Sequence, residues 1–338
     1  MTEEIKLLLA GDLGGTKTSL AVFSAEAGLR APLLEGRLPS GRYPSLEALV
    51  KDFFKQMQEA GLDPQALERA CFGVAGPVVD GQATITNLPW RMSEQQLAQA
   101  LELASVALIN DLAAIAQGVP HLAEDDYHTL NEGEPTPHGT IAVVAPGTGL
   151  GEGFLVWAGT RYRSCPSEGG HVDFAPVNDE QLELRRYLQQ QFRHVSYERV
   201  CSGLGLPNIY AYFKDSGYAA EPAWLAEQLA GASDKTPLIM QAALAEDGPV
   251  LCRATLDMFV SILGAEAGNM ALKVMASGGV YLGGGIPPRI LPALEQPHFL
   301  EAFRSKGRFA EMLGRVPVKV ILNPKAALLG AATYGFEL

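Results

Sequence analysis

Glycine-rich turns that follow short apolar runs constrain the fold of this chain more than any other feature. One turn, from Gly11 to Thr16, separates an apolar run over residues 5–10 from another over 18–23. A second turn, from Pro146 to Gly151, separates a run over 140–145 from another over 153–157. A turn between two such runs is typical of a hairpin, so we predict two strand–turn–strand units. Their likeness suggests an internal duplication.

A third turn, Gly283 to Gly285, directly follows an apolar run over 280–282. Glycine lets backbone N–H groups approach a ligand and converge on it, which is how phosphate oxygens are held. Three such turns, each at the end of a strand, favour phosphate binding. Neither standard fingerprint is present, however. Thr16 replaces the second glycine of a P-loop, and Glu152 or Phe154 replaces the last glycine of a dinucleotide motif.

The rest of the chain alternates between strands and helices, which predicts an α/β fold with mixed or parallel sheets. Further strands are expected at 70–74 and 105–109, and helices at 45–60, 94–101, 112–117, 180–191, 207–213, 250–275 and 324–334. A polar, proline-containing stretch over 121–138 reads as a boundary region. The length of 338 residues fits about two domains.

The charge balance excludes some partners. With 26 basic and 38 acidic residues the net charge is −12, which argues against nucleic acid or an anionic membrane. The four cysteines are too scattered for a disulfide framework or a zinc site, so we expect free thiols in a reduced cytoplasm. The acidic N-terminus and the lack of an apolar run of about 20 residues predict neither a signal peptide nor a membrane span.

Acidic residues near the turns allow two interpretations each. Asn110 and Asp111 follow the strand at 105–109 and open a helix, so they form either an N-cap or a general base at a strand end. Asp12 lies inside the first turn, where it either satisfies local N–H groups or contacts Mg²⁺ or its water.

The segment from Ser167 to Phe174 holds a carboxylate and an imidazole close together. Two glycines between Glu168 and His171 prevent a stable helix, so we expect a loop that enters a strand. The pair suits the hydroxyls of a sugar, although a catalytic dyad, a metal pair or a structural pair at a turn would give the same pattern. Glu198 alone reads as a first-turn helix acid.

Together these motifs resemble bacterial glucokinases of the hexokinase–actin–Hsp70 ATPase superfamily, nearly from end to end. The resemblance implies an α/β, two-domain ribonuclease-H-like or actin-like ATPase fold, with a mixed sheet in each domain and an active-site cleft between the domains. We expect a small domain of residues 1–121 plus 322–338 and a large domain of residues 122–321.

The resemblance also implies a role for each motif. Asp111 is the expected catalytic base, and the expected sugar contacts are Asn110, Asp111, Glu168, His171 and Glu198. The residues expected to bind the nucleotide are Gly11, Asp12, Gly14, Gly15, Thr16, Gly147, Thr148, Gly149, Gly283, Gly284 and Gly285. The implied reaction transfers the γ-phosphoryl group of ATP, with Mg²⁺, to the 6-hydroxyl of glucose, and we expect a cytoplasmic homodimer without zinc or protein metal ligands.

Two departures separate this chain from neighbouring families. Lys17 replaces the Asn that enterobacterial-type glucokinases commonly have at this position. In this respect the chain is similar to sugar kinases of the ROK (repressor–ORF–kinase) family. The Cys-rich zinc motif typical of ROK proteins is missing, and Cys201 and Cys252 have no partners to build it. We therefore favour the glucokinase branch. The alternative function is a kinase for another hexose, such as fructose, mannose or an amino sugar. A ROK-type DNA-binding regulator is disfavoured because the first strand is expected near Ile5.

Overall fold

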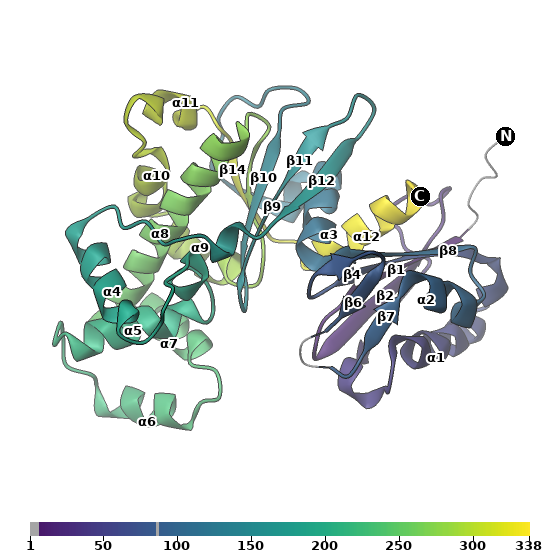
Figure 1. The fold of residues 1–338 in the computed structure, drawn as a ribbon, viewed down its shortest axis with the longest axis horizontal. Coiled ribbons are helices and arrows are strands. Elements are labelled where there is room, and N and C mark those ends of the chain that lie inside the picture. The colour runs from purple at the N-terminus through teal and green to yellow at the C-terminus, as the bar shows by residue number, and fades with distance from the viewer. Residues whose placement is uncertain (1–6, 86–87) are drawn as a thin grey trace. The chain divides into compact units, whose positions relative to one another are not determined.

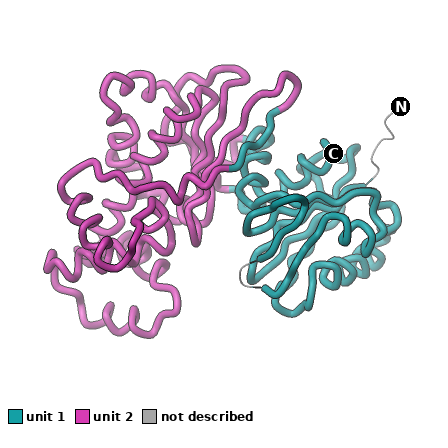
Figure 2. Tube along the Cα trace, in the orientation of Figure 1, with its two compact units in different colours: residues 1–123, 162–166, 323–338 teal, residues 124–161, 167–322 magenta. Residues whose placement is uncertain are grey.

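The chain divides into two compact units, which we describe separately. A computed structural model describes residues 7–85 and 88–338, so Ile5 and Lys6 of the predicted first strand lie outside the described residues. Unit 1 comprises residues 1–123, 162–166 and 323–338, and unit 2 comprises residues 124–161 and 167–322 (Figure 2). Both the start and the end of the described chain therefore belong to unit 1.

Unit 1 is built on a five-stranded mixed sheet in the order β3-β2-β1-β4-β8 (Figure 1). The first hairpin pairs β1 with β2 in antiparallel fashion, whereas β1, β4 and β8 are parallel. A smaller sheet contains β5, β6 and β7. The strands of this unit are β1 (Leu7–Leu13), β2 (Lys17–Phe23), β3 (Leu34–Pro39), β4 (Leu67–Val74), β5 (Val78–Val79), β6 (Gln82–Thr84), β7 (Arg91–Ser93) and β8 (Ser105–Asn110).

Alternation along β1 places successive side chains in two different cores. Leu9 and Leu13 pack in one core with helices α1 (Leu46–Glu59) and α2 (Glu94–Leu101). Leu8 and Ala10 pack in the other with α3 (Asp111–Gly118) and α12 (Ala326–Phe336). This two-faced burial follows from the period of two along a strand, and it makes a helix–sheet–helix sandwich. The predicted helices at 45–60, 94–101 and 112–117 are confirmed.

Helices α3 and α12 approach each other so closely that only glycine fits at their contact. A Cβ atom added at Gly330 would lie 1.7 Å from the carbonyl oxygen of Ala114 and 2.7 Å from the amide nitrogen of Gly118. A Cβ atom at Gly118 would lie 2.5 Å from the carbonyl oxygen of Ala326. Because α3 begins at Asp111, this contact fixes the helix that carries the candidate base.

Unit 2 repeats the strand order of unit 1 around its own hairpin. Its six-stranded sheet has the order β12-β11-β10-β13-β14-β9, with β10 and β11 antiparallel and β10, β13 and β14 parallel. The first five strands match the order of unit 1, as the predicted duplication requires. The strands of this sheet are β9 (Tyr127–Asn131), β10 (Ile141–Pro146), β11 (Leu150–Trp157), β12 (Tyr162–Ser167), β13 (Gly279–Leu282) and β14 (Val318–Ile321). Residues 162–166 of β12 belong to this sheet by hydrogen bonding, although they are grouped with unit 1.

The core of unit 2 centres on the long helix α8 (Val250–Val274), which is buried along much of its length. Apolar side chains of the sheet and of the surrounding helices form one continuous cluster with it. The other helices of this unit are α4 (Asp179–Gln189), α5 (Gly205–Asp215), α6 (Ala223–Gly231), α7 (Thr236–Leu244), α9 (Leu291–Leu294), α10 (Pro297–Arg304) and α11 (Ala310–Gly314). In the part of the chain that the structure describes, no helix combines the length and the apolar character needed to cross a membrane.

The stretch over 121–138 contains the division between the two units, after residue 123, as the sequence predicts. It also contains β9, which pairs antiparallel with β14. One sequence prediction about this unit is wrong. The segment from Glu168 to His171 follows a strand, β12, and does not lead into one. After the 3-10 turn η5 (Gly169–His171) the chain makes only an isolated bridge between Asp173 and Ser196.

Candidate active site

The first glycine turn is braced by a serine from outside the turn. The turn closes through the amide of Gly14, which donates to the carbonyl of Lys17 at 3.0 Å. Ser40 Oγ donates to the Gly14 carbonyl at 2.7 Å, and the Ser40 amide donates to the Thr16 carbonyl at 3.1 Å. Thr16 is left exposed at the tip of the turn. The sequence analysis missed Ser40, whose only signal is a small polar residue at the end of β3.

Asp12 and Asp111 both lie at the carboxyl edge of the unit 1 sheet. Asp12 is the penultimate residue of β1, opposite Gly73 of β4, and Asp111 follows β8. Burial and repulsion from Asp111 raise the pKa of Asp12 to about 6, against the attraction of Arg37. Burial also raises the pKa of Asp111, although the Leu112 amide opposes this by donating a hydrogen bond at 2.9 Å. The parallel strand ends therefore bring two carboxyl groups within electrostatic range.

Asn110 holds the start of α3, so the N-cap interpretation of this residue is confirmed. Its side-chain oxygen accepts from the amides of Leu112 at 2.9 Å and Ala113 at 3.3 Å. Its side-chain nitrogen donates to the carbonyl of Gly76 at 3.0 Å. Asp111 lies at the first position of the helix, where the helix dipole favours a carboxylate, and it shares the Leu112 amide with the Asn110 cap.

The second and third glycine turns are tied together within unit 2. The amide of Gly283 donates to the Val144 carbonyl at 2.9 Å, and the amide of Ile286 donates to the Pro146 carbonyl at 3.2 Å. Gly284 has a φ of 78° and a Cβ atom added to it would lie 2.5 Å from the Pro146 carbonyl oxygen. Only glycine satisfies both conditions. Since Pro146 ends β10, the turn after β13 is seated directly on the turn at residues 147–149.

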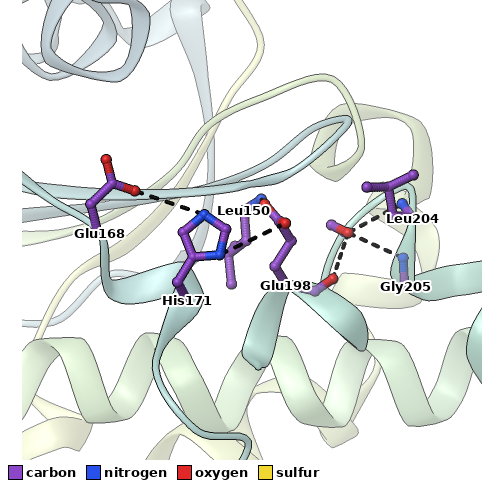
Figure 3. Close-up of polar contacts among 7 residues, drawn as sticks. Leu150, Glu168, His171, Glu198, Leu204 and Gly205 are labelled. Atoms are coloured by element: carbon purple, nitrogen blue, oxygen red, sulfur yellow. Dashed lines mark hydrogen bonds and ion pairs between the residues drawn. The ribbon is translucent and has the colours of Figure 1, made fainter. Parts of the chain in front are cut away.

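A glutamate connects the second turn to the candidate sugar-binding residues. Glu198, in the 3-10 turn η6 (Tyr197–Arg199), accepts from the amide of Leu150 through Oε2 at 3.1 Å. Its other oxygen lies 3.9 Å from Nδ1 of His171, whose Nε2 lies 3.9 Å from Oε2 of Glu168. Figure 3 shows His171 between these two carboxylates. Glu168 and His171 are largely exposed, so both have polar atoms available to a ligand.

Ser202 is a second residue that the sequence analysis missed. Its hydroxyl donates to the Glu198 carbonyl at 2.6 Å and accepts from the amides of Leu204 and Gly205, both at 3.1 Å. The neighbouring amide of Gly203 donates to the Gly147 carbonyl at 2.8 Å. These bonds fix η6 against the second turn. The only sequence signal was a Ser-Gly pair shortly after Glu198.

The predicted site residues thus fall into two groups, one in each unit. Unit 1 brings together the first turn, Asn110 and Asp111. Unit 2 brings together the turns at 147–149 and 283–285 with three side chains, Glu168, His171 and Glu198. The two groups differ in the functional groups that they supply. Unit 1 supplies a carboxyl group that can accept a proton, whereas unit 2 supplies an imidazole and carboxylates suited to hydroxyls.

Comparison with solved structures shows to which class of proteins this fold belongs. A glucokinase from an Antarctic psychrotroph has a TM-score of 0.83 and 31 % identity, covering 98 % of this chain and 99 % of that one. A ROK family glucokinase from Streptomyces griseus is more distant, with a TM-score of 0.63, 21 % identity, and coverage of 98 % and 100 %. The fold, with its duplicated sheets and glycine turns, is that of the sugar kinases with an actin-like ATPase fold.

Sequence comparison identifies the family within this class of proteins. The family model named Glucokinase matches residues 9–337. A glucokinase of Trichormus variabilis is 41 % identical over 339 residues, covering 96 % of this chain and 98 % of the relative. The chain belongs to the glucokinase family. The expected branch is therefore confirmed, with ROK kinases as more distant structural neighbours.

Proposed function

We propose that this protein is an ATP-dependent glucokinase, in which Asp111 accepts the proton of the 6-hydroxyl of glucose as that oxygen attacks the γ-phosphorus of ATP. The observation that carries the proposal is the position of Asp111 at the first residue of α3, a helix that Asn110 caps. A carboxylate held at a rigid strand end is suited to act as a general base. Transfer of a phosphoryl group depends otherwise on positioning and on stabilisation of charge.

The sugar would be held by hydroxyl-directed groups from both units. Asn110, Glu168, His171 and Glu198 offer acceptors and donors in a fixed arrangement within their own units. A site built this way rejects analogues that leave its polar groups unpaired, which favours glucose over the alternative hexoses. The active-site cleft between the units is part of this proposal, and so is exclusion of water when the units close.

The phosphates of ATP would be held by backbone amides of the three glycine turns. Asp12 fits a contact to Mg²⁺ as well, because it is a partly buried carboxyl group that the negative charge of Asp111 repels, and a divalent cation would offset this repulsion. Asp12 would contact the ion or its water. Bound there, Mg²⁺ would neutralise phosphate charge. With the amides and Mg²⁺ holding the phosphates, an acidic chain needs few basic side chains for ATP.

The test is an Asp111→Asn variant assayed with ATP and Mg²⁺ against a panel of hexoses. Loss of a general base lowers kcat by about 100-fold or more, whereas binding of glucose should change only modestly. The matched control is Asp179→Asn, because Asp179 follows an Asn cap at the start of α4 just as Asp111 does at α3. Near-normal turnover by the Asp111 variant would contradict the assignment. Preferred turnover of fructose, mannose or an amino sugar would favour the alternative substrate.

The remaining expectations concern the setting of the enzyme. All four cysteines are free thiols, and three of them are buried, which supports a reducing compartment such as the cytoplasm. A homodimer is proposed from the family resemblance.

A further inference from the structure

One buried carboxyl group is used by none of the steps above. Glu152 lies on β11 and is 1 % exposed. Neither of its carboxyl oxygens has a hydrogen-bond partner in the residues that the structure describes. It points to the same side of the strand as Leu150 and Phe154, into the apolar core of unit 2. A buried carboxyl group without a hydrogen-bond partner is strongly disfavoured in its charged form, so its presence calls for an explanation.

Lys273, whose positive charge acts on Glu152, is already engaged by another carboxylate. On α8, Glu266 is fully buried and accepts from Lys273 Nζ at 3.0 Å and from Asn269 Nδ2 at 2.8 Å. Asn269 also donates to the hydroxyl of Tyr197 at 3.1 Å. Glu266 is therefore a satisfied carboxylate, and it repels a negative charge on Glu152.

The carboxyl group of Glu152 also lies against the backbone of the turn that carries Glu168 and His171. A Cβ atom added at Gly169 would lie 2.0 Å from Oε2 of Glu152 and 3.0 Å from its Cδ. A Cβ atom at Gly170 would lie 2.1 Å from the carbonyl oxygen of Leu150. The turn is therefore laid directly on β11 at residues 150–152. Glycine is needed at position 170, where the obstacle is backbone, whereas at position 169 the obstacle is the Glu152 side chain itself.

We propose that Glu152 is a positioning residue, whose uncharged carboxyl group supports the backbone of Gly169 and so places Glu168 and His171 for the sugar. The inference rests on the proposed function, since it concerns the same sugar site. It gives a reason for a carboxyl group where the rest of the strand face is apolar. An acid in this position can be neutral or charged, and the two forms contact the turn differently.

The surroundings favour the neutral form at neutral pH. Burial, followed by repulsion from Glu266, raises the pKa of Glu152 to about 8, against the attraction of Lys273. Several titratable and charged groups lie on the elements packed around it: Glu266 and Lys273 on α8, Glu168 before η5 and His171 on it, Tyr197 and Glu198 on η6, Cys201 after η6, and Lys306 beyond α10.

This arrangement gives the affinity for glucose a defined pH dependence. If the sugar binds best when Glu152 is protonated, binding weakens as pH rises through about 8, because the proton must first be regained. The glucose KM should therefore rise by about tenfold or more between pH 7 and pH 9.5, with the ATP KM nearly constant. Glucose binding near pH 8 should also take up protons, which calorimetry in buffers of different ionisation enthalpy detects.

The test compares wild type with Glu152→Gln, which keeps the shape of the side chain and cannot ionise. We expect its glucose KM to match that of wild type at pH 7 and to stay within about twofold up to pH 9.5, without proton uptake. The control is Glu221→Gln, another largely buried glutamate of unit 2, which is bonded to Tyr210 and Lys214. Its pH profile should follow wild type. A Glu152→Gln profile that also follows wild type would overturn the proposal.

A second pair of variants tests the contact itself. Glu152→Ala should raise the glucose KM at pH 7 by roughly fivefold, because small displacements of positioning groups are costly, with little change in the ATP KM. Gly169→Ala should raise it in wild type and raise it much less in the Glu152→Ala background, where room exists for the added methyl group. Equal effects of Gly169→Ala in both backgrounds would refute the contact. If wild type itself fails to phosphorylate glucose, the proposed function fails instead.

Discussion

The contact between α3 and α12 makes one glycine unusually sensitive to substitution. In Gly330→Ala, the added methyl group would lie 1.7 Å from the carbonyl oxygen of Ala114, a backbone atom that cannot rotate away. Carbon and oxygen atoms in ordinary contact are about 3.5 Å apart, so the helices must separate by roughly 1.8 Å. Overpacking of this kind lowers the free energy of unfolding by about 3 kcal/mol. The higher helix propensity of alanine raises it by about 1 kcal/mol. The free energy of unfolding should therefore fall by about 2 kcal/mol.

The assay is thermal unfolding of the purified protein, together with steady-state kinetics. A loss of about 2 kcal/mol in a unit of roughly 150 residues lowers the melting temperature by about 4–8 °C. Because α3 begins at Asp111, kcat should fall as well, even below the melting transition. Gly231→Ala is the control, since Gly231 ends α6 with open space around its Cα, and it should be neutral or slightly stabilising. An unchanged or raised melting temperature in Gly330→Ala would refute the close contact.

Three further outcomes are expected. His171→Ala should raise the glucose KM by about tenfold and leave the ATP KM unchanged, and an effect on the ATP KM alone would contradict a role at the sugar. Gly284→Ala should raise the ATP KM, because alanine is strained at a φ of 78° and its methyl group would displace the Pro146 carbonyl; kinetics at saturating glucose measure this. Folding raises the pKa of Asp12 from its usual 3.8 to about 6, so its contribution to stability is complete below pH 4 and is lost as pH rises through 6. The melting temperature of wild type should therefore fall relative to Asp12→Asn across that window, by the equivalent of about 3 kcal/mol, and parallel curves would contradict it.

Patterns of apolar residues in the sequence correctly predicted the helices and strands whose buried side chains follow a regular period or a continuous apolar run. The apolar face of α1, capped by Ser45 through the amide of Ala48 at 3.3 Å, shows the period of a helix in the sequence. The strand β4, an apolar run in the sequence, is buried over its second half. By contrast, β9 is half-buried at every position, so its sequence carries neither alternation nor an apolar run. It exists because it can pair with β14, a partner almost 200 residues away that no local pattern reveals.

Parts of the candidate site could be predicted from local patterns. Asn110 and Asp111 were found because they follow a strand and open a helix. The segment from Glu168 to His171 was found because an acid, two glycines and a histidine are close together, but its expected strand was wrong. Gly170 is required by the backbone of Leu150 on a separate strand, and Gly169 packs against Glu152 of the same strand. Glu152 itself gave no signal, since a single acid in a strand usually faces solvent. Its burial depends on how β11 is packed, which follows from the tertiary fold.

The position of α12 in the chain has a consequence for synthesis. Its side chains Leu328 and Ala331 share a core with Leu8 and Ala10 of β1, although the two segments are more than 300 residues apart. Unit 2 is complete in sequence once residue 322 has been made, whereas the sheet of unit 1 lacks the helix that covers part of one face until residues 326–336 emerge. The strand β1 is therefore made long before α12, the helix that packs against it. Chaperones that shield apolar strand faces should bind nascent unit 1 for longer than nascent unit 2.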